Sequence, residues 1–357
     1  MTHRPGTIRS AFPGFHPDAT TKPSAAGSLR GWFIMETEGV TRTVSVTDLP
    51  SRSVESIMRH SQIKNVLEAS GFRAPVESIR PLGGGLYNEA CILECSADRY
   101  VLRIAPPDEQ PKLFYEKKMM RSEPGIHRAV RSRTDVPAPE VVHHDFSRQH
   151  LDRDFVVMEF LPGDSGSFDR AELGDYVAQV HGICGEEYGY PDREAPTGEE
   201  WVEVFRTYVR KIFDDCLRAG AIDQDEHTRF LDFYDERWDA VGHEVQPRLL
   251  HLDLWSANIL VQDGRISGIL DFDRGMYGDP ELEFAVLDTY GNTTPRFFEG
   301  YGESRPRGAA ARTRRNLYLV YEIIKYAFIR LARGGSHSMA RNFVGKSLRI
   351  LDENPPF

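Results

Sequence analysis

Cysteine is scarce in this sequence, and long apolar runs are absent. Four cysteines occur in 357 residues, at positions 91, 95, 184 and 216. None is paired with nearby histidines at a spacing typical of zinc sites, and Cys91 and Cys95 fall along one expected strand. We therefore expect four reduced cysteines and a cytoplasmic protein. No apolar segment is long enough to cross a bilayer, and the first residues do not resemble a secretory signal.

Positive charge is also in short supply. The chain has 44 Lys and Arg against 54 Asp and Glu, a formal net charge of −10 at pH 7. A general nucleic-acid-binding surface is usually basic, so this balance argues against one. The length suffices for about two domains or lobes with a sizeable core. The composition thus indicates a globular protein that binds neither nucleic acid nor membrane.

The N-terminal segment lacks acidic residues and any regular hydrophobic period. Asp18 is the only acid before Glu36, and Pro, Gly, Ser and Thr are frequent around it. We expect residues 1–50 to form a disordered extension. Met35 is consistent with a later gene start, and a basic, acid-poor segment is also typical of a transit peptide.

The rest of the chain divides into a β-rich part and a helical part. A helix is predicted from Val54 to Ser70 and ends before a glycine, and a second is predicted from Glu116 to Arg131. The strands of the first part form an antiparallel meander with tight turns, followed by a buried strand. They are predicted at Val76–Leu82, Ala90–Cys95 and Tyr100–Ile104, and within residues 154–163.

After Gly163 the hydrophobic pattern becomes helical. Two stripes repeat every three or four residues, one from Trp201 to Cys216 and one from Leu317 to Leu331, and each precedes a glycine. Both indicate helices packed on a core. We therefore expect an α+β protein with two lobes, over residues 51–162 and 163–357.

Polar residues crowd an otherwise apolar segment, "LLHLDLWSANILVQDGRISGILDFDRG", at residues 249–275. Asp263-Gly264 is typical of a two-residue hairpin turn and needs no chemical role. The residues flanking that hairpin are different, because a carboxylate at the end of a buried strand needs a partner. Asp253, Asn258 and Asp271 would converge where the two antiparallel strands bring their outer ends together.

The spacing of these residues matches a phosphoryl-transfer motif. "HLDLWSAN" fits H-x-D-x-x-x-x-N, in which Asp253 would accept a substrate hydroxyl proton and Asn258 would bind magnesium. Asp271 begins "DFD", where kinases have D-F-G with a magnesium-binding Asp. Mg²⁺ prefers hard oxygen ligands, so Asn258 and Asp271 suffice beside phosphate oxygens. His251 is the second catalytic candidate, and we expect it to support the loop through hydrogen bonds.

A glycine run and a basic strand residue extend the pattern. Gly83, Gly84 and Gly85 lie between two predicted strands, where backbone N–H groups can approach a phosphate; a plain flexible turn is the alternative. Arg103 points opposite to its apolar neighbours on the next strand. In kinases a basic residue at this place contacts the phosphates and pairs with a helix glutamate. Glu123 is the favoured partner and Glu116 the alternative.

With these motifs, the chain resembles the aminoglycoside phosphotransferase and choline kinase-like family, relatives of the protein kinases. "GGGLYNEA", "HLDLWSANIL" and "YGDPELEFAVLDTYG" are most similar to the fructosamine kinase branch. The resemblance implies a two-lobed protein-kinase-like fold and ATP·Mg²⁺ bound with the help of Asn88 and Glu159. It also implies phosphorylation of a small-molecule hydroxyl, on an amino sugar, a fructosamine or an antibiotic. Leu252 departs from the family pattern, which usually has Gly there.

Two other functions compete with a small-molecule kinase. A protein kinase needs an activation segment, but only "DRGMYGDP" separates Phe272 from Glu281. A nucleotide-binding pseudokinase would be expected to have lost one of the three motif residues, although Leu252 keeps this alternative open. For a cationic acceptor, an acidic wall on the helical lobe is a further hypothesis, with solvated helix faces as its alternative. Its members would be Asp214, Asp215, Asp288 and Glu322.

Overall fold

The computed structural model describes residues 32–33, 44–45, 60–82, 87–242 and 245–354. The chain divides into two compact units, Met1–Leu49 and Pro50–Phe357. In the first, β1 (Trp32–Phe33) pairs antiparallel with β2 (Val44–Ser45). The remainder of residues 1–50, where disorder was expected, lies outside the described residues.

The second unit begins with a helix and a five-stranded antiparallel sheet of order β3-β4-β5-β7-β6. Helix α1 (His60–Ala69) ends before Gly71, whose φ of 92° suits glycine; the predicted residues 54–59 lie outside the described range. One face of the sheet packs on α1 through Ile63, Leu67 and the apolar side chains of the strands. The strands are β3 (Val76–Leu82), β4 (Glu89–Cys95), β5 (Arg99–Ile104), β6 (Val141–Asp145) and β7 (Phe155–Glu159). Strands β3, β4 and β5 match the sequence predictions to within a residue, and β7 lies within the predicted residues 154–163.

The helix expected over Glu116–Arg131 begins later than predicted. Two short 3₁₀ turns, Phe114–Glu116 and Met119–Ser122, precede α2 (Glu123–Arg133). Pro124 lies in the first turn of α2, where its missing N–H costs no hydrogen bond. The proline therefore marks the start of the helix, and Glu116 lies outside it.

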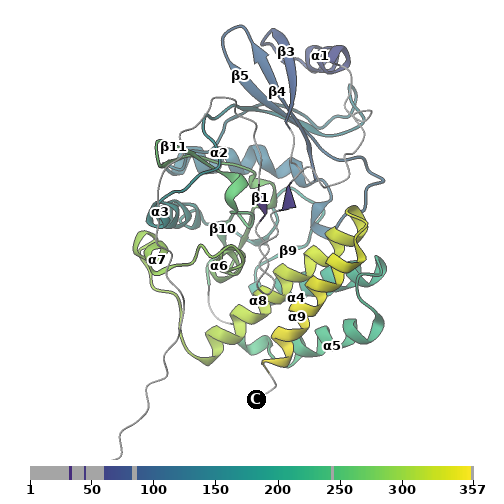
Figure 1. Cartoon of the computed structure of the whole chain (residues 1–357), viewed down its shortest axis with the longest axis vertical. Coiled ribbons are helices and arrows are strands. Elements are labelled where there is room, and N and C mark those ends of the chain that lie inside the picture. Colours follow the sequence, from purple (N-terminus) through teal and green to yellow (C-terminus); the bar gives the residue numbers. More distant parts are fainter. Residues whose placement is uncertain (1–31, 34–43, 46–59, 83–86, 243–244, 355–357) are drawn as a thin grey trace, which may run out of the picture. The chain divides into compact units, whose positions relative to one another are not determined.

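Helices form most of the remainder (Figure 1). The two predicted stripes are buried on α4 and α8, which pack against each other. Helix α8 continues as a π-helix at Ile329–Arg333. The bounds are α3 (Arg170–His181), α4 (Trp201–Arg218), α5 (Gln224–Asp235), α6 (Pro280–Thr289), α7 (Pro295–Tyr301), α8 (Ala309–Phe328) and α9 (His337–Asp352).

Two small antiparallel sheets carry the motif segment between these helices. One has the order β10-β13-β8-β9, formed by Arg248–Leu250, Met276–Gly278, Tyr188–Gly189 and Thr197–Gly198. The other is the hairpin β11 (Ile259–Gln262) and β12 (Arg265–Ile269). Its turn residues Asp263 and Gly264 have φ of 51° and 75°, as expected for a type I′ turn. Asp279 then caps α6 by accepting from the Glu281 N–H at 3.0 Å, with Pro280 at the first helical position.

Two expectations from composition can be compared with the structure. All four cysteines are free, and Cys91 and Cys95 both lie on β4. No helix among the described residues has the length and apolar character needed to span a membrane.

Candidate active site

The turn after β10 is held in an unusual backbone conformation by a buried glutamate. Leu252 has a φ of 62°, which side chains other than glycine rarely adopt. Glu283 of α6 accepts the His251 N–H at 2.5 Å and the Leu252 N–H at 3.1 Å. Burial alone would raise the pKa of Glu283, but nearby His181, at 4.0 Å, together with His251 and the Leu252 N–H, holds it below its usual value. An ionised, buried Glu283 therefore fixes the turn that presents Asp253.

Both carboxylate oxygens of Asp253 accept hydrogen bonds. Asn258 Nδ2 donates to Oδ2 at 2.9 Å, and Arg274 Nη1 donates to Oδ1 at 2.9 Å. The carboxylate keeps about a fifth of its side-chain surface accessible, whereas Arg274 is more buried. Charge-assisted bonds of this kind fix the orientation of a carboxylate, which is what a group that receives a proton requires.

His251 has both ring nitrogens engaged. Nδ1 accepts the Asp253 N–H at 3.2 Å, so Nε2 carries the proton and donates to the Leu270 carbonyl at 2.9 Å. The ring is buried and packs against Phe272 at 4.4 Å between centroids. It thus links the turn to the end of the hairpin, in the supporting position expected from the sequence.

The hairpin brings part of the motif together. Besides its contact with Asp253, Asn258 accepts the Leu270 N–H through its carbonyl at 2.9 Å, which ties the two ends of the hairpin. Asp271 follows immediately, with a φ of 66°. Its carboxylate turns to the β-rich part of the unit, where it meets Arg103 at 2.6 Å.

Arg103 on β5 is surrounded by three carboxylates. It contacts Glu123 at 2.6 Å, Asp271 at 2.6 Å and Asp273 at 3.0 Å. Asp273 also accepts from Asn88 Nδ2 at 3.0 Å. Arg103 therefore joins α2 to the "DFD" segment, and Asn88 joins the start of β4 to the same segment.

Three acids beside one guanidinium cannot all be equally ionised. Burial and the charge of Asp271 raise the pKa of Asp273 well above its usual range. Burial also raises the pKa of Glu123, to about 7, against the lowering effect of Arg103. For Asp271, Arg103 and a hydrogen bond outweigh burial and lower the pKa. Asp271 is thus the acid of the group that stays ionised, as a metal ligand must.

The structure distinguishes between the two glutamates considered as partners of Arg103. Glu123 pairs with Arg103, whereas Glu116 pairs with Arg333 and accepts the Leu113 N–H at 2.7 Å. The late start of α2 explains the choice, because it places Glu123 on the helix and Glu116 in a separate turn.

Other expected residues lie apart from this group. Glu159 ends β7 and faces Arg131 at 3.2 Å, without a contact to Arg103 or Asp271 among the described residues. Gly83, Gly84 and Gly85 lie outside the described residues.

The hypothesis of an acidic wall facing the acceptor is wrong, because Asp215 and Glu322 are buried. Three of the four members pair with an arginine or a lysine, and Asp214 contacts His227, which carries a charge only when protonated. The pairs are Asp214 with His227 at 2.9 Å, Asp215 with Arg218 at 2.6 Å, Asp288 with Arg305 at 2.8 Å and Glu322 with Lys325 at 2.5 Å.

Three further residues of the site were missed by sequence reasoning. Asp273 was noted only as a departure from the glycine of D-F-G, although its position two residues after Asp271 was a usable signal. Arg274 and Glu283 gave no such signal, because their partners Asp253, His251 and Leu252 are 21 to 32 positions away in the chain.

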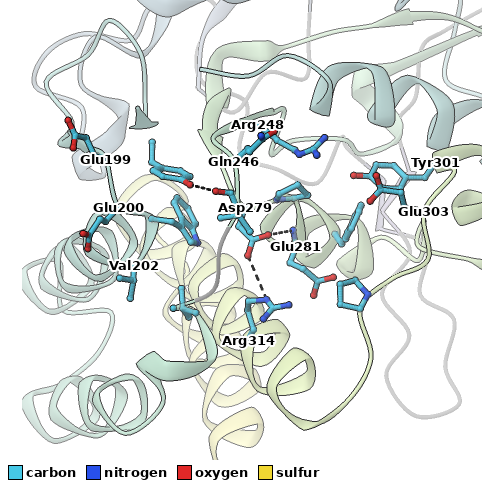
Figure 2. A pocket seen from close by; sticks show the side chains of 18 of the residues that line it. Glu199, Glu200, Val202, Gln246, Arg248, Asp279, Glu281, Tyr301, Glu303 and Arg314 are labelled. Atoms are coloured by element: carbon cyan, nitrogen blue, oxygen red, sulfur yellow. Dashed lines mark hydrogen bonds and ion pairs between the residues drawn. The ribbon is translucent and has the colours of Figure 1, made fainter. Parts of the chain in front are cut away.

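A cavity of about 1000 Å³ lies elsewhere, at the start of α6. Figure 2 shows Asp279, Glu281 and Arg314 along its wall, and neither Asp253, Asn258 nor Asp271 lines it. This cavity is therefore separate from the motif.

Comparison with known proteins identifies the family. The family model described as "Phosphotransferase enzyme family" matches residues 78–316. The chain belongs to this family. A probable ketoamine kinase of Staphylococcus aureus is 28% identical over 265 residues, covering 69% of this chain and 85% of the relative. A chloroplastic protein-ribulosamine 3-kinase of Arabidopsis thaliana is 25% identical over 309 residues, covering 82% and 90%.

Solved structures agree on the protein-kinase-like fold of this phosphotransferase. A putative fructosamine-3-kinase from Haemophilus somnus has a TM-score of 0.60 at 18% identity, covering 80% of this chain and 96% of that one. The aminoglycoside phosphotransferase APH(2″)-IIa in complex with gentamicin has a TM-score of 0.57 at 15% identity, covering 84% and 98%. The expected fold and family are therefore confirmed, and with them a kinase acting on a small-molecule hydroxyl.

Proposed function

We propose that this phosphotransferase is a ketoamine kinase, which transfers the γ-phosphoryl group of ATP to a hydroxyl of a sugar linked to an amine. The observation that carries the proposal is the arrangement around Asp253, which is oriented by Asn258 and Arg274 next to the Arg103–Asp271 pair. Curated relatives named as ketoamine and ribulosamine kinases support the acceptor class.

Each residue of the arrangement has a distinct part in the transfer. Asp253 would accept the proton of the acceptor hydroxyl as its oxygen attacks the γ-phosphorus. Arg274 and Asn258 would keep the Asp253 carboxylate pointed at that proton. Arg103 is held by Glu123. It would contact the phosphates of bound ATP in place of its present contact with Asp271.

The donor set fits a magnesium ion. Asp271 is ionised and Asn258 offers an amide oxygen, both hard ligands suited to Mg²⁺ beside phosphate oxygens. Among the described residues no group of three or more His, Cys, Asp and Glu is arranged around a metal position, so nucleotide oxygens would complete the coordination. Bound Mg²⁺ supplies charge neutralisation on the phosphates.

Steady-state ADP release with fructosyl-lysine as acceptor tests the proposal. We expect turnover by the wild type and a loss of about 10²–10⁴-fold in kcat for Asp253→Asn, the usual contribution of a general base, with ATP binding nearly unchanged. Asp214→Asn, which removes one carboxylate from the exposed end of another ion pair, is the matched control. Unchanged turnover in Asp253→Asn would exclude it as the base, and absence of turnover by the wild type would refute the ketoamine assignment.

A further inference from the structure

A tyrosine near the proposed base is unusually accessible. Tyr290, which follows α6, is 38% exposed, and Val142 at 41% is the only other large hydrophobic side chain of the described residues with comparable exposure. Single exposed hydrophobic residues are common, so exposure alone does not mark a site. The surroundings of Tyr290 do.

Tyr290 is linked to the surroundings of Asp253 through helix α8. Its hydroxyl is hydrogen-bonded to the Tyr326 hydroxyl of α8 at 2.9 Å. Burial is the main cause that raises the pKa of the Tyr290 hydroxyl; Tyr326 and the charge of Asp253 raise it further, and Arg274 lowers it. Tyr326 lies one helical turn after Glu322 on α8, and Glu322 is reached at 3.6 Å by Arg274, the partner of Asp253, so the two tyrosines lie beside the ion pairs around Asp253.

Charges in this region cancel. Asp253 pairs with Arg274 at 2.9 Å, Arg274 reaches Glu322 at 3.6 Å, and Glu322 pairs with Lys325 at 2.5 Å. The two acids and two bases sum to zero, and Glu322 and Lys325 are almost fully buried. A polycation would find no free negative charge in this chain of ion pairs.

An accessible aromatic ring beside uncharged hydroxyls suits a sugar. The C–H face of a sugar ring packs on an aromatic face through dispersion and burial of apolar surface. The phenol hydroxyls of Tyr290 and Tyr326 can exchange hydrogen bonds with sugar hydroxyls. This combination of one flat apolar surface and a few placed polar groups is typical of small-molecule sites.

We propose that Tyr290 is a specificity-determining residue of the acceptor site, on whose ring the sugar of the acceptor stacks, with the Tyr326 hydroxyl as a hydrogen-bonding neighbour. The inference rests on the proposed function. It adds where the sugar of the acceptor binds and why this part of the site suits an uncharged group. In the transfer, the hydroxyl oxygen of the stacked sugar forms the new bond to the γ-phosphorus, the bond from that phosphorus to ADP breaks, and the hydroxyl proton passes to Asp253.

Variants of Tyr290 separate its ring from its hydroxyl. Tyr290→Leu removes the ring. We expect the KM for fructosyl-lysine to rise about tenfold, near the upper end of the free energy that an aromatic contact contributes. The KM for ATP should stay within about twofold of wild type. Tyr290→Phe keeps the ring and loses only the bond to Tyr326, so its KM should stay within about threefold. Val142→Ala, at the other exposed hydrophobic residue, is the control for non-specific effects.

Calorimetric titration of fructosyl-lysine in the presence of a non-hydrolysable ATP analogue gives a readout independent of turnover. Binding by the wild type that is weakened about tenfold in Tyr290→Leu but not in Tyr290→Phe supports the inference. Wild-type turnover with an unchanged acceptor KM in Tyr290→Leu would overturn the inference and leave the proposed function standing. Turnover of kanamycin but not fructosyl-lysine, or no binding of fructosyl-lysine, would overturn both.

Discussion

Replacing Leu252 tests how the catalytic turn tolerates a residue other than glycine. Leu252 has a φ of 62° and is 1% exposed, packed in the main core of the helical part. Leu252→Gly would relieve the left-handed strain, which costs about 1–2 kcal/mol for a side-chain-bearing residue. It would also remove a buried leucine side chain, and Leu→Ala changes in cores cost about 2.7–5.0 kcal/mol.

The loss of packing outweighs the relief of strain. We expect Leu252→Gly to lower the free energy of unfolding by about 1–4 kcal/mol, the difference between these two terms. Leu252→Ala loses nearly the same packing but keeps the strain, so it should be less stable than Leu252→Gly by about 1 kcal/mol. The bonds from the two turn N–H groups to Glu283 remain in both variants.

Urea unfolding measured by circular dichroism at constant pH gives these differences. Leu254 is the matched control, because it lies in the same loop, is 2% exposed and is not among the residues with positive φ. There the order should invert, with Leu254→Ala more stable than Leu254→Gly by about 0.5–1 kcal/mol. If Leu252→Gly equalled or exceeded the wild type in stability, or if the order of Gly and Ala were the same at both positions, the reasoning would be refuted.

Two further predictions concern buried ionisable side chains. Arg103→Lys keeps the positive charge but lacks the planar guanidinium that contacts three carboxylates at once. We expect the KM for ATP to rise about tenfold, which corresponds to the loss of one charge-assisted bond of about 1.5 kcal/mol. Arg80→Lys, in the exposed pair with Glu94, is the control, and equal effects in both variants would contradict the prediction. Burial lowers the pKa of His127 to about 4, so the folded state favours the neutral ring. The resulting contribution to the free energy of unfolding is complete above pH 6.5 and is lost as the pH falls towards 4, by about 3 kcal/mol in total. Urea unfolding from pH 7 to pH 4 should therefore show a weaker pH dependence for His127→Gln than for the wild type, and parallel curves would rule the contribution out.

Local patterns in the sequence predicted the elements and the motif well. Asp263-Gly264 predicts the hairpin because both residues tolerate positive φ. The contact between Asp253 and Asn258 could also be expected from the sequence, because the two residues are only five positions apart in a tight turn.

Pairing over longer distances depended on where elements begin. Two glutamates could have met Arg103 on sequence grounds, and the late start of α2 at Glu123 selects one of them. The acidic wall failed for a related reason. Asp215 and Glu322 are buried and therefore need a partner. Each finds it three positions on in its own helix, in Arg218 and Lys325.

The sequence by itself determined the fold class, the hairpin and the identity of Asp253, Asn258 and Asp271 as the polar residues at its ends, because periodicity and turn chemistry act over a few residues. Only the tertiary structure decided what orients them. Glu283 reaches the turn from α6, and Arg274 connects Asp253 with Glu322 of α8. Such contacts arise from packing between elements far apart in the chain, where no residue spacing records them.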